Sequence, residues 1–126
     1  LAIDALVGGF DLHLHFTDTE VGKEGASSGL ALVLAGISAY TQRPLRARLA
    51  ATGEITIYGE VKPVGGIHEK IVSAMHNGVR TVLLPRRNLR EARDLPEEVR
   101  RAVELIYVDS VAEAVPRALL SPEDFK

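Results

Sequence analysis

The fold is decided by the stretch Ile67-His-Glu-Lys-Ile-Val-Ser-Ala-Met-His-Asn-Gly-Val-Arg-Thr-Val-Leu-Leu-Pro85. Its first part repeats apolar residues at helical spacing, and Asn77-Gly78 is typical of a helix end. Residues 79–84 are mostly β-branched or apolar and stop at a proline, which predicts a strand. A helix that leads directly into a buried strand predicts a sheet with packed helices.

The same alternation continues toward the C-terminus. We expect short helices over 88–94 and 96–102, a strand over 103–108 and a final helix that reaches Leu120. Ser110, followed three residues later by Glu113, is the signature of a helix N-terminus. We interpret the charged stretch 86–101 as a solvated surface.

Upstream of the quoted stretch, helix and strand patterns are mixed. We expect a helix over 1–7 that ends at Gly8-Gly9, a strand over 10–16, a polar loop over 17–26 and a buried helix over 28–40. Two strands, over 45–51 and 54–61, are expected to join through Thr52-Gly53. The whole order predicts an α/β (α+β) fold with a mixed sheet.

Composition excludes several classes of function. The chain has 126 residues, which suits one domain, and its net charge of −2 gives no basic footprint for nucleic acid. It has no cysteine, so disulfides, thiolate zinc sites and a cysteine nucleophile are impossible, and a cytoplasmic setting fits. No apolar run is long enough to cross a membrane. Because the chain starts at Leu1 rather than Met, we expect it to be part of a longer protein.

The loop Gly25-Ala-Ser-Ser-Gly29, which opens the predicted buried helix, is the first candidate site. Backbone N–H groups at a helix start attract an anion or an oxyanion, and glycines permit close approach. Ser27 or Ser28 is interpreted in three ways: as a plain N-cap, as a nucleophile beside an oxyanion hole, or as part of a phosphate cradle.

A nucleophilic serine needs a base, and both histidine and lysine are candidates. His13 and His15 share one strand face, but no third metal ligand is evident, and an exposed sheet face explains them. His68 and His76 lie two turns apart on the predicted helix, without an acidic partner at an evident spacing. Lys70 borders the apolar face of that helix, although most lysines in such places are solvated.

Two segments resemble the proteolytic domain of Lon proteases. They are Lys23-Glu-Gly-Ala-Ser-Ser-Gly-Leu-Ala31 and Thr52-Gly-Glu-Ile-Thr-Ile-Tyr-Gly-Glu-Val-Lys-Pro-Val-Gly-Gly-Ile-His-Glu-Lys70. The spacing between the two motifs matches the family without a gap, and the likeness extends from about Asp11 to Leu120. The resemblance implies that residues 1–126 are one Lon-like proteolytic domain whose first elements are missing.

The resemblance also implies roles for individual residues. The nucleophile falls on Ser27, the general base on Lys70, and a threonine that orients the lysine on Thr52. Glu24 and Gly25 stand where the family has an acidic residue followed by glycine. A carboxylate beside Lys70 would favour the charged form of the lysine, so we expect Glu24 to point away from it in an active state.

This chain departs from the family pattern at three positions. Ala26 replaces a proline, Ser28 replaces an alanine, and His68 replaces the first lysine of the Lys-Glu-Lys segment. Ser28 therefore competes with Ser27 for the role of nucleophile, and Lys70 is the only lysine left in its segment.

The implied activity is that of a serine endopeptidase with a Ser–Lys dyad, which hydrolyses unfolded or damaged proteins in protein quality control. The family's peptidase domains form hexamers. We expect no metal and no cofactor in this domain. The sequence has no Walker A motif, so ATP is expected only if an ATPase module lies elsewhere in the parent chain. The alternatives are a non-catalytic assembly domain of a DNA-repair ATPase and half of a small-molecule kinase.

Overall fold

The computed structural model describes residues 2–5, 12–15 and 27–121. The strands are β1 (Ala2–Ala5), β2 (Leu12–His15), β3 (Leu49–Ala51), β4 (Glu54–Ile55), β5 (Val61–Lys62), β6 (Thr81–Pro85) and β7 (Glu104–Val108). The helices are α2 (Gly29–Thr41), α3 (Ile67–His76), η1 (Arg86–Asn88), α4 (Leu89–Arg93), α5 (Glu97–Ala102) and α6 (Val111–Ala118). No helix of these described ranges is long and apolar enough to span a membrane.

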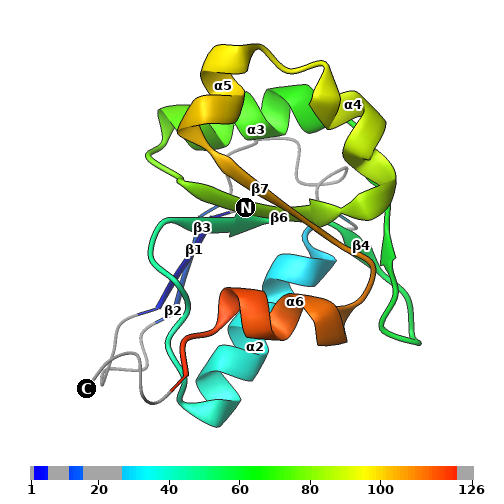
Figure 1. The fold of residues 1–126 in the computed structure, drawn as a ribbon. Helices are drawn as coiled ribbons and strands as arrows, with labels where there is room; N and C mark the ends of the chain where they lie inside the picture. The colour runs from blue at the N-terminus through cyan, green and yellow to red at the C-terminus, as the bar shows by residue number, and fades with distance from the viewer. Residues whose placement is uncertain (1, 6–11, 16–26, 122–126) are drawn as a thin grey trace.

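One mixed sheet forms the centre of the molecule, in the strand order β2-β1-β3-β6-β7 (Figure 1). Strands β3, β6 and β7 are parallel, with Leu49 opposite Thr81 and Thr81 opposite Glu104. Strand β1 is antiparallel to both of its neighbours. The predicted α/β fold with a mixed sheet is therefore confirmed.

Helices cover both faces of this sheet: α3, α4 and α5 lie on one side, and α2 and α6 on the other (Figure 1). The side chains of β6 alternate between the two layers, because Leu83 belongs to the α2–α6 core cluster, and Val82 and Leu84 to the α3–α5 cluster. Every residue of β6 is buried, as expected for a parallel strand with helices on both faces.

The helix predicted over 1–7 is wrong. Residues Ala2–Ala5 form β1, which is paired on both sides: Ala2 lies opposite His15 of β2 and opposite Ala50 of β3. In this position the backbone N–H and C=O groups of β1 can form hydrogen bonds with strands on both sides. This pairing outweighs the helical spacing of the apolar residues, because the apolar run is so short. The Gly8-Gly9 helix end lies outside the described residues.

The single strand predicted over 54–61 is also wrong, since this segment is itself a hairpin of β4 and β5. The hydroxyl of Thr56 accepts hydrogen bonds from the N–H groups of Tyr58 (3.2 Å) and Glu60 (3.1 Å), and Gly59 has a φ of +81°. A threonine that bonds to the backbone just ahead of it competes with a continuous strand. This hairpin forms a separate two-stranded sheet, so Thr52-Gly53 joins two sheets.

The other expected helices and strands are confirmed, with ends shifted by a few residues, whereas the loop expected over 17–26 lies outside the described residues. Strand β3 starts later than predicted, after Arg48, whose φ of +57° interrupts the extended backbone. The N-cap at Ser110 is confirmed, because its hydroxyl accepts a hydrogen bond of 3.1 Å from the N–H of Glu113. Helix α6 ends at Ala118 rather than Leu120, and Leu119 forms a β-bridge with Leu45.

We predict that Ser110→Ala lowers the free energy of unfolding by about 1 kcal/mol, because the N–H of Glu113 loses its acceptor at the start of α6. Urea unfolding followed by circular dichroism measures this change. The matched control is Ser73→Ala, within helix α3, where no hydroxyl bond is lost and a change within about 0.5 kcal/mol is expected. Equal effects of the two substitutions would contradict the capping role.

Candidate active site

Ser27 and Ser28 lie where helix α2 begins, and both are buried, with 7% and 2% of their surface exposed. Ser28 is the N-cap residue, but its side chain makes no capping hydrogen bond. Ser28 is therefore the N-cap of α2 by position, as one interpretation expected, but without a capping bond from its hydroxyl. Burial places both hydroxyls inside the fold, at the terminus whose N–H groups attract negative charge.

The backbone of Ser27 is bound to the end of strand β3. Its carbonyl accepts a hydrogen bond of 2.9 Å from the N–H of Gly53 and a longer one, 3.5 Å, from the hydroxyl of Thr52. In return, the N–H of Leu30 donates to the carbonyl of Gly53 at 3.0 Å. The N–H of Thr52 donates to Leu83 of β6, so this junction lies at the carboxyl end of the parallel strands. The structure thus brings Ser27 and Thr52 together.

Two glycines make this junction possible. A Cβ on Gly29 would lie 3.2 Å from a side-chain carbon of Ile55 and 3.3 Å from its backbone nitrogen. Gly53 has a φ of +156°, and a Cβ there would lie 2.7 Å from Val61. Real Cβ atoms do not come as close as 2.7 Å, so a side chain at Gly53 would force Val61 or the backbone to shift. A Cβ at Gly29 would be a tight fit that its neighbours must relieve by a few tenths of an ångström.

Lys70 lies in the first turn of α3 and is half-buried. Its neighbours on the helix, Ile67 and Ile71, are buried in the same core cluster as Ala50 of β3. Helix α3 precedes β6 through the short turn after His76, so the helix begins above the carboxyl ends of the strands. Lys70 therefore comes to the same end of the sheet as Ser27 and Thr52.

Asn88 fixes the entry to helix α3, a role that our sequence analysis missed. It is fully buried after strand β6, and its amide nitrogen donates to the carbonyl of Val64 at 2.9 Å while its amide oxygen accepts from the N–H of Val64 at 3.0 Å. It also donates to the carboxylate of Glu91 at 3.1 Å. The only sequence signal is an asparagine three residues after a buried strand, and its partner is 24 residues away in the chain.

The structure describes some of the other candidate residues from the sequence but not all of them. Glu24 and Gly25 lie outside the described residues, as do the side chains of His13 and His15. The ring of His68 is hydrogen-bonded through Nε2 to the carbonyl of Glu91, which makes that nitrogen the donor. Among the described residues, no cluster of three or more His, Asp or Glu side chains could hold a metal ion.

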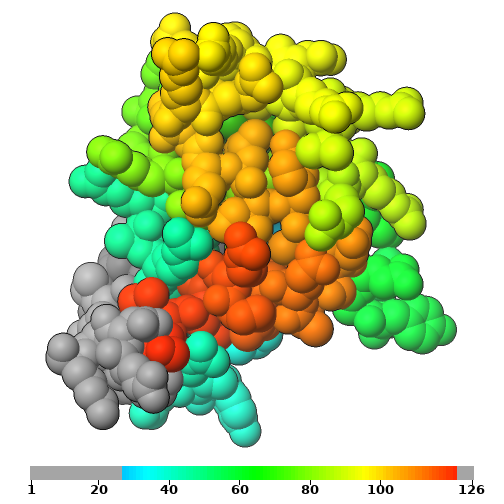
Figure 2. Space-filling model, viewed as in Figure 1, coloured from blue at the N-terminus to red at the C-terminus, as the bar shows by residue number. Residues whose placement is uncertain are grey.

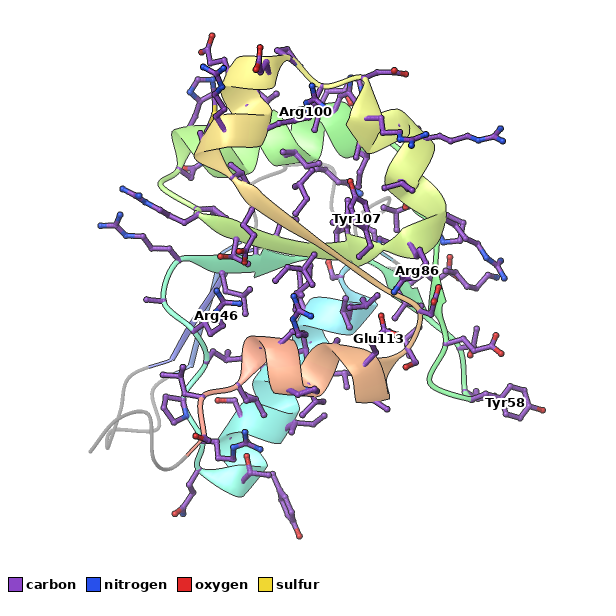
Figure 3. The ribbon with its side chains drawn as sticks, in the orientation of Figure 1. Arg46, Tyr58, Arg86, Arg100, Tyr107 and Glu113 are labelled. Atoms are coloured by element: carbon purple, nitrogen blue, oxygen red, sulfur yellow. The ribbon has the colours of Figure 1, made fainter. Side chains whose placement is uncertain are left out.

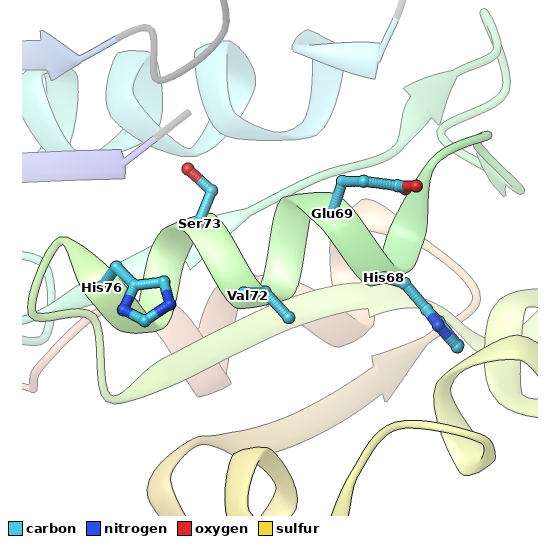
Figure 4. A pocket seen from close by; sticks show the side chains of 5 residues that line it. All are labelled: His68, Glu69, Val72, Ser73 and His76. Atoms are coloured by element: carbon cyan, nitrogen blue, oxygen red, sulfur yellow. The ribbon is translucent and has the colours of Figure 1, made fainter.

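The outer side of α3 carries an open hollow of about 510 Å³ (Figure 4). Its lining residues are His68, Glu69, Val72, Ser73 and His76. Ile67 and Ile71, by contrast, lie on the face of α3 that packs into the core. The hollow therefore contains none of the proposed catalytic residues.

We predict that Gly53→Ala lowers the free energy of unfolding by about 1–3 kcal/mol, since the new methyl group overlaps Val61 and the backbone conformation suits glycine. Chemical denaturation measures this change. Gly36→Ala in helix α2 is the matched control: nothing lies within 4 Å of its added carbon, so stability should stay equal or rise by about 0.5–1 kcal/mol. A Gly53→Ala variant as stable as the parent would contradict the close approach.

Comparisons with known proteins show which family the chain resembles. The model of the family described as "Lon protease (S16) C-terminal proteolytic domain" matches residues 3–121. The chain is 40% identical over 121 residues to a Lon protease of Desulfatibacillum aliphaticivorans, 44% over 109 residues to one of Roseiflexus castenholzii, and 46% over 109 residues to one of Phenylobacterium zucineum.

These alignments cover 96%, 86% and 86% of this chain, but only 15%, 14% and 14% of the relatives. The chain thus spans about one-seventh of the length of the curated relatives that it matches. The family resemblance of the two sequence motifs is confirmed. The chain belongs to the family of Lon protease C-terminal proteolytic domains.

Proposed function

We propose that the chain is a serine endopeptidase domain in which Ser27 is the nucleophile and Lys70 the general base. Membership of the Lon family supports the peptidase activity. The observation that carries the assignment is the hydrogen bond between the Ser27 carbonyl and the N–H of Gly53, which fixes the serine beside Thr52 at the end of β3. The chain topology supports the role of Lys70, since helix α3 begins at the same end of the sheet as this junction.

The reaction begins when Ser27 Oγ attacks the carbonyl carbon of a peptide bond and Lys70 Nζ accepts the hydroxyl proton. This step requires an uncharged lysine. When the tetrahedral intermediate collapses, the C–N bond breaks and Lys70 gives the proton to the leaving amine. Water then attacks the ester on Ser27, with Lys70 again taking and returning a proton, which releases the acid and restores the serine.

The negative charge that develops on the carbonyl oxygen is stabilised by backbone N–H groups at the start of α2. The N–H of Leu30 already donates to Gly53, so the groups concerned are those that precede Leu30. Thr52 is proposed as a positioning residue: it is buried, its hydroxyl donates to the carbonyl of Ser27, and the family resemblance assigns it the role of orienting the lysine amine. Glu24 is proposed to point away from Lys70 in the active state.

The wider proposals concern the parent protein. We propose that the substrates are unfolded polypeptides, that the domain assembles as a hexamer and that it acts in the cytoplasm. No cofactor is proposed for this domain, and ATP would act only through an ATPase module elsewhere in the parent chain. No nucleic acid and no membrane is proposed as a partner. The substrate class and the hexamer are what the resemblance to the Lon family implies.

The dyad is tested with Ser27→Ala and Lys70→Ala, for which we expect the rate of casein hydrolysis to fall by about 10³-fold or more. Ser28→Ala is the matched control, since it removes the neighbouring buried hydroxyl and should retain most activity. Circular dichroism and urea unfolding show whether each variant is folded. Lys70→Ala with most of its activity, or Ser28→Ala without activity in a folded protein, would contradict the assignment.

Thr52 is tested with Thr52→Val, which keeps the shape of the side chain and removes its hydroxyl. We expect kcat to fall about tenfold with KM little changed, because one hydrogen bond next to the nucleophile is lost. Thr52→Ser should restore kcat, since it keeps the hydroxyl. If Thr52→Ser is as slow as Thr52→Val, the hydroxyl has no part in positioning the site.

A further inference from the structure

Strand β7 forms an open edge of the central sheet. It stands last in the strand order and is paired only with β6. Its sequence, Glu-Leu-Ile-Tyr-Val, is rich in residues that favour strands and contains no proline or lysine, and its one charged side chain, Glu104, stands at its first position. Figure 2 shows β7 in open view between α5 and α6.

The direction of its peptide groups follows from the pairing with β6. The N–H of Glu104 donates to the carbonyl of Arg80 at 2.8 Å, so Glu104, Ile106 and Val108 turn their peptide groups toward β6. Leu105 and Tyr107 turn theirs outward. In the described part of the chain, the N–H groups of these two residues have no hydrogen-bond partner. This edge therefore offers unpaired donors to an incoming strand.

Ion pairs lie at both ends of the open edge of β7 (Figure 3). At its start, Arg46 pairs with Glu104 at 3.5 Å. At its end, Arg86 pairs with Asp109 at 2.8 Å and with Glu113 at 2.7 Å, and its guanidinium also donates to the carbonyl of Tyr107 at 3.3 Å. These carboxylates raise the pKa of Arg86 through their hydrogen bonds. The free backbone of the edge lies between the two ion-pair groups.

Positive charge flanks one face of this edge. Leu105 and Tyr107 pack against the α3–α5 core cluster, so Tyr107 faces the helices that carry Arg93 and Arg100. Burial raises the pKa of Tyr107, and both arginines lie close enough to oppose that rise. Both are exposed, and neither forms an ion pair within the described residues.

We propose that the edge of β7 from Glu104 to Tyr107 binds an extended acidic segment of another polypeptide, which adds to the sheet as a further strand. Its backbone carbonyls accept from the outward N–H groups of Leu105 and Tyr107, as in other cases of strand addition, while the carbonyl of Tyr107 stays bound to Arg86. Its carboxylates lie on the face of Arg93 and Arg100, where they meet two unpaired guanidinium groups.

A second copy of the chain fits this edge less well. When two copies of β7 pair in antiparallel fashion, equivalent faces of the two sheets lie on the same side of the joined sheet. Glu104 lies on the same face as Ile106 and Val108, which is the face covered by α2 and α6. The acidic side chain of a second β7 would therefore lie on the face opposite Arg93 and Arg100. An acidic segment of a different polypeptide meets both requirements, the backbone and the charge.

The proposal is tested by titrating the full chain with a short capped peptide of alternating valine and aspartate, followed by amide NMR. We expect shifts centred on Leu105 and Tyr107 and slower hydrogen exchange at their two N–H groups. The matched peptide of alternating valine and lysine should bind at least about tenfold more weakly, because its charge opposes the arginines. Equal binding of both peptides, or shifts centred elsewhere, would overturn the proposal.

Substitutions separate the contribution of backbone pairing to peptide binding from the contribution of charge. We expect the affinity for the aspartate peptide to fall by about fivefold to tenfold in Arg93→Glu and in Arg100→Glu. The control is Arg117→Glu, the same exchange in the helix layer on the other face of the sheet, which should change the affinity less than twofold. Leu105→Pro removes one outward donor and should abolish binding; because it could fail to fold, the exposed arginine variants decide the outcome. Peptide-independent dimerisation that Leu105→Pro abolishes would show that a second copy covers the edge instead.

Discussion

The structure depends on a pair of hydrogen bonds that join the start of α2 to the end of β3. The carbonyl of Ser27 accepts from the N–H of Gly53, and the carbonyl of Gly53 accepts from the N–H of Leu30. Both bonds are buried beneath the β4–β5 hairpin, where a side chain on Gly53 would strike Val61. A helix N-terminus is thereby held against the carboxyl end of a parallel strand, which is a common place for a reacting group in α/β proteins.

The surrounding elements are arranged around this junction. Strand β6 binds Thr52 from one side through the carbonyl of Leu83, and Asn88 behind β6 holds Val64 at the entry to α3. The first turn of α3 then presents Lys70 at the same end of the sheet. The two motifs are far apart in sequence: buried hydrogen bonds join Ser27 to Thr52 and Gly53, and the chain topology brings Lys70 to the same end of the sheet.

Much of the fold was predictable because its signals are local. The helix of α3, the strand of β6 and the cap at Ser110 follow from apolar spacing, a helix end and one hydroxyl, and all are found as expected. The failures have long-range causes. Strand β1 exists because β2 and β3 pair with it, and Asn88 acts on a residue distant in sequence. Ser27, Thr52 and Lys70 could be named because their motifs resemble a family, whereas spacing alone left several interpretations open.

The central claim is that the hydroxyl of Ser27 is the reactive nucleophile of this site. The most direct measurement is covalent labelling of the full chain with a fluorophosphonate, followed by mass spectrometry of its peptides to locate the modified side chain. We expect one label per chain, on Ser27, and its loss in Lys70→Ala because the serine is no longer activated. A label on Ser28 or on any other side chain, or equal labelling without Lys70, would contradict this claim.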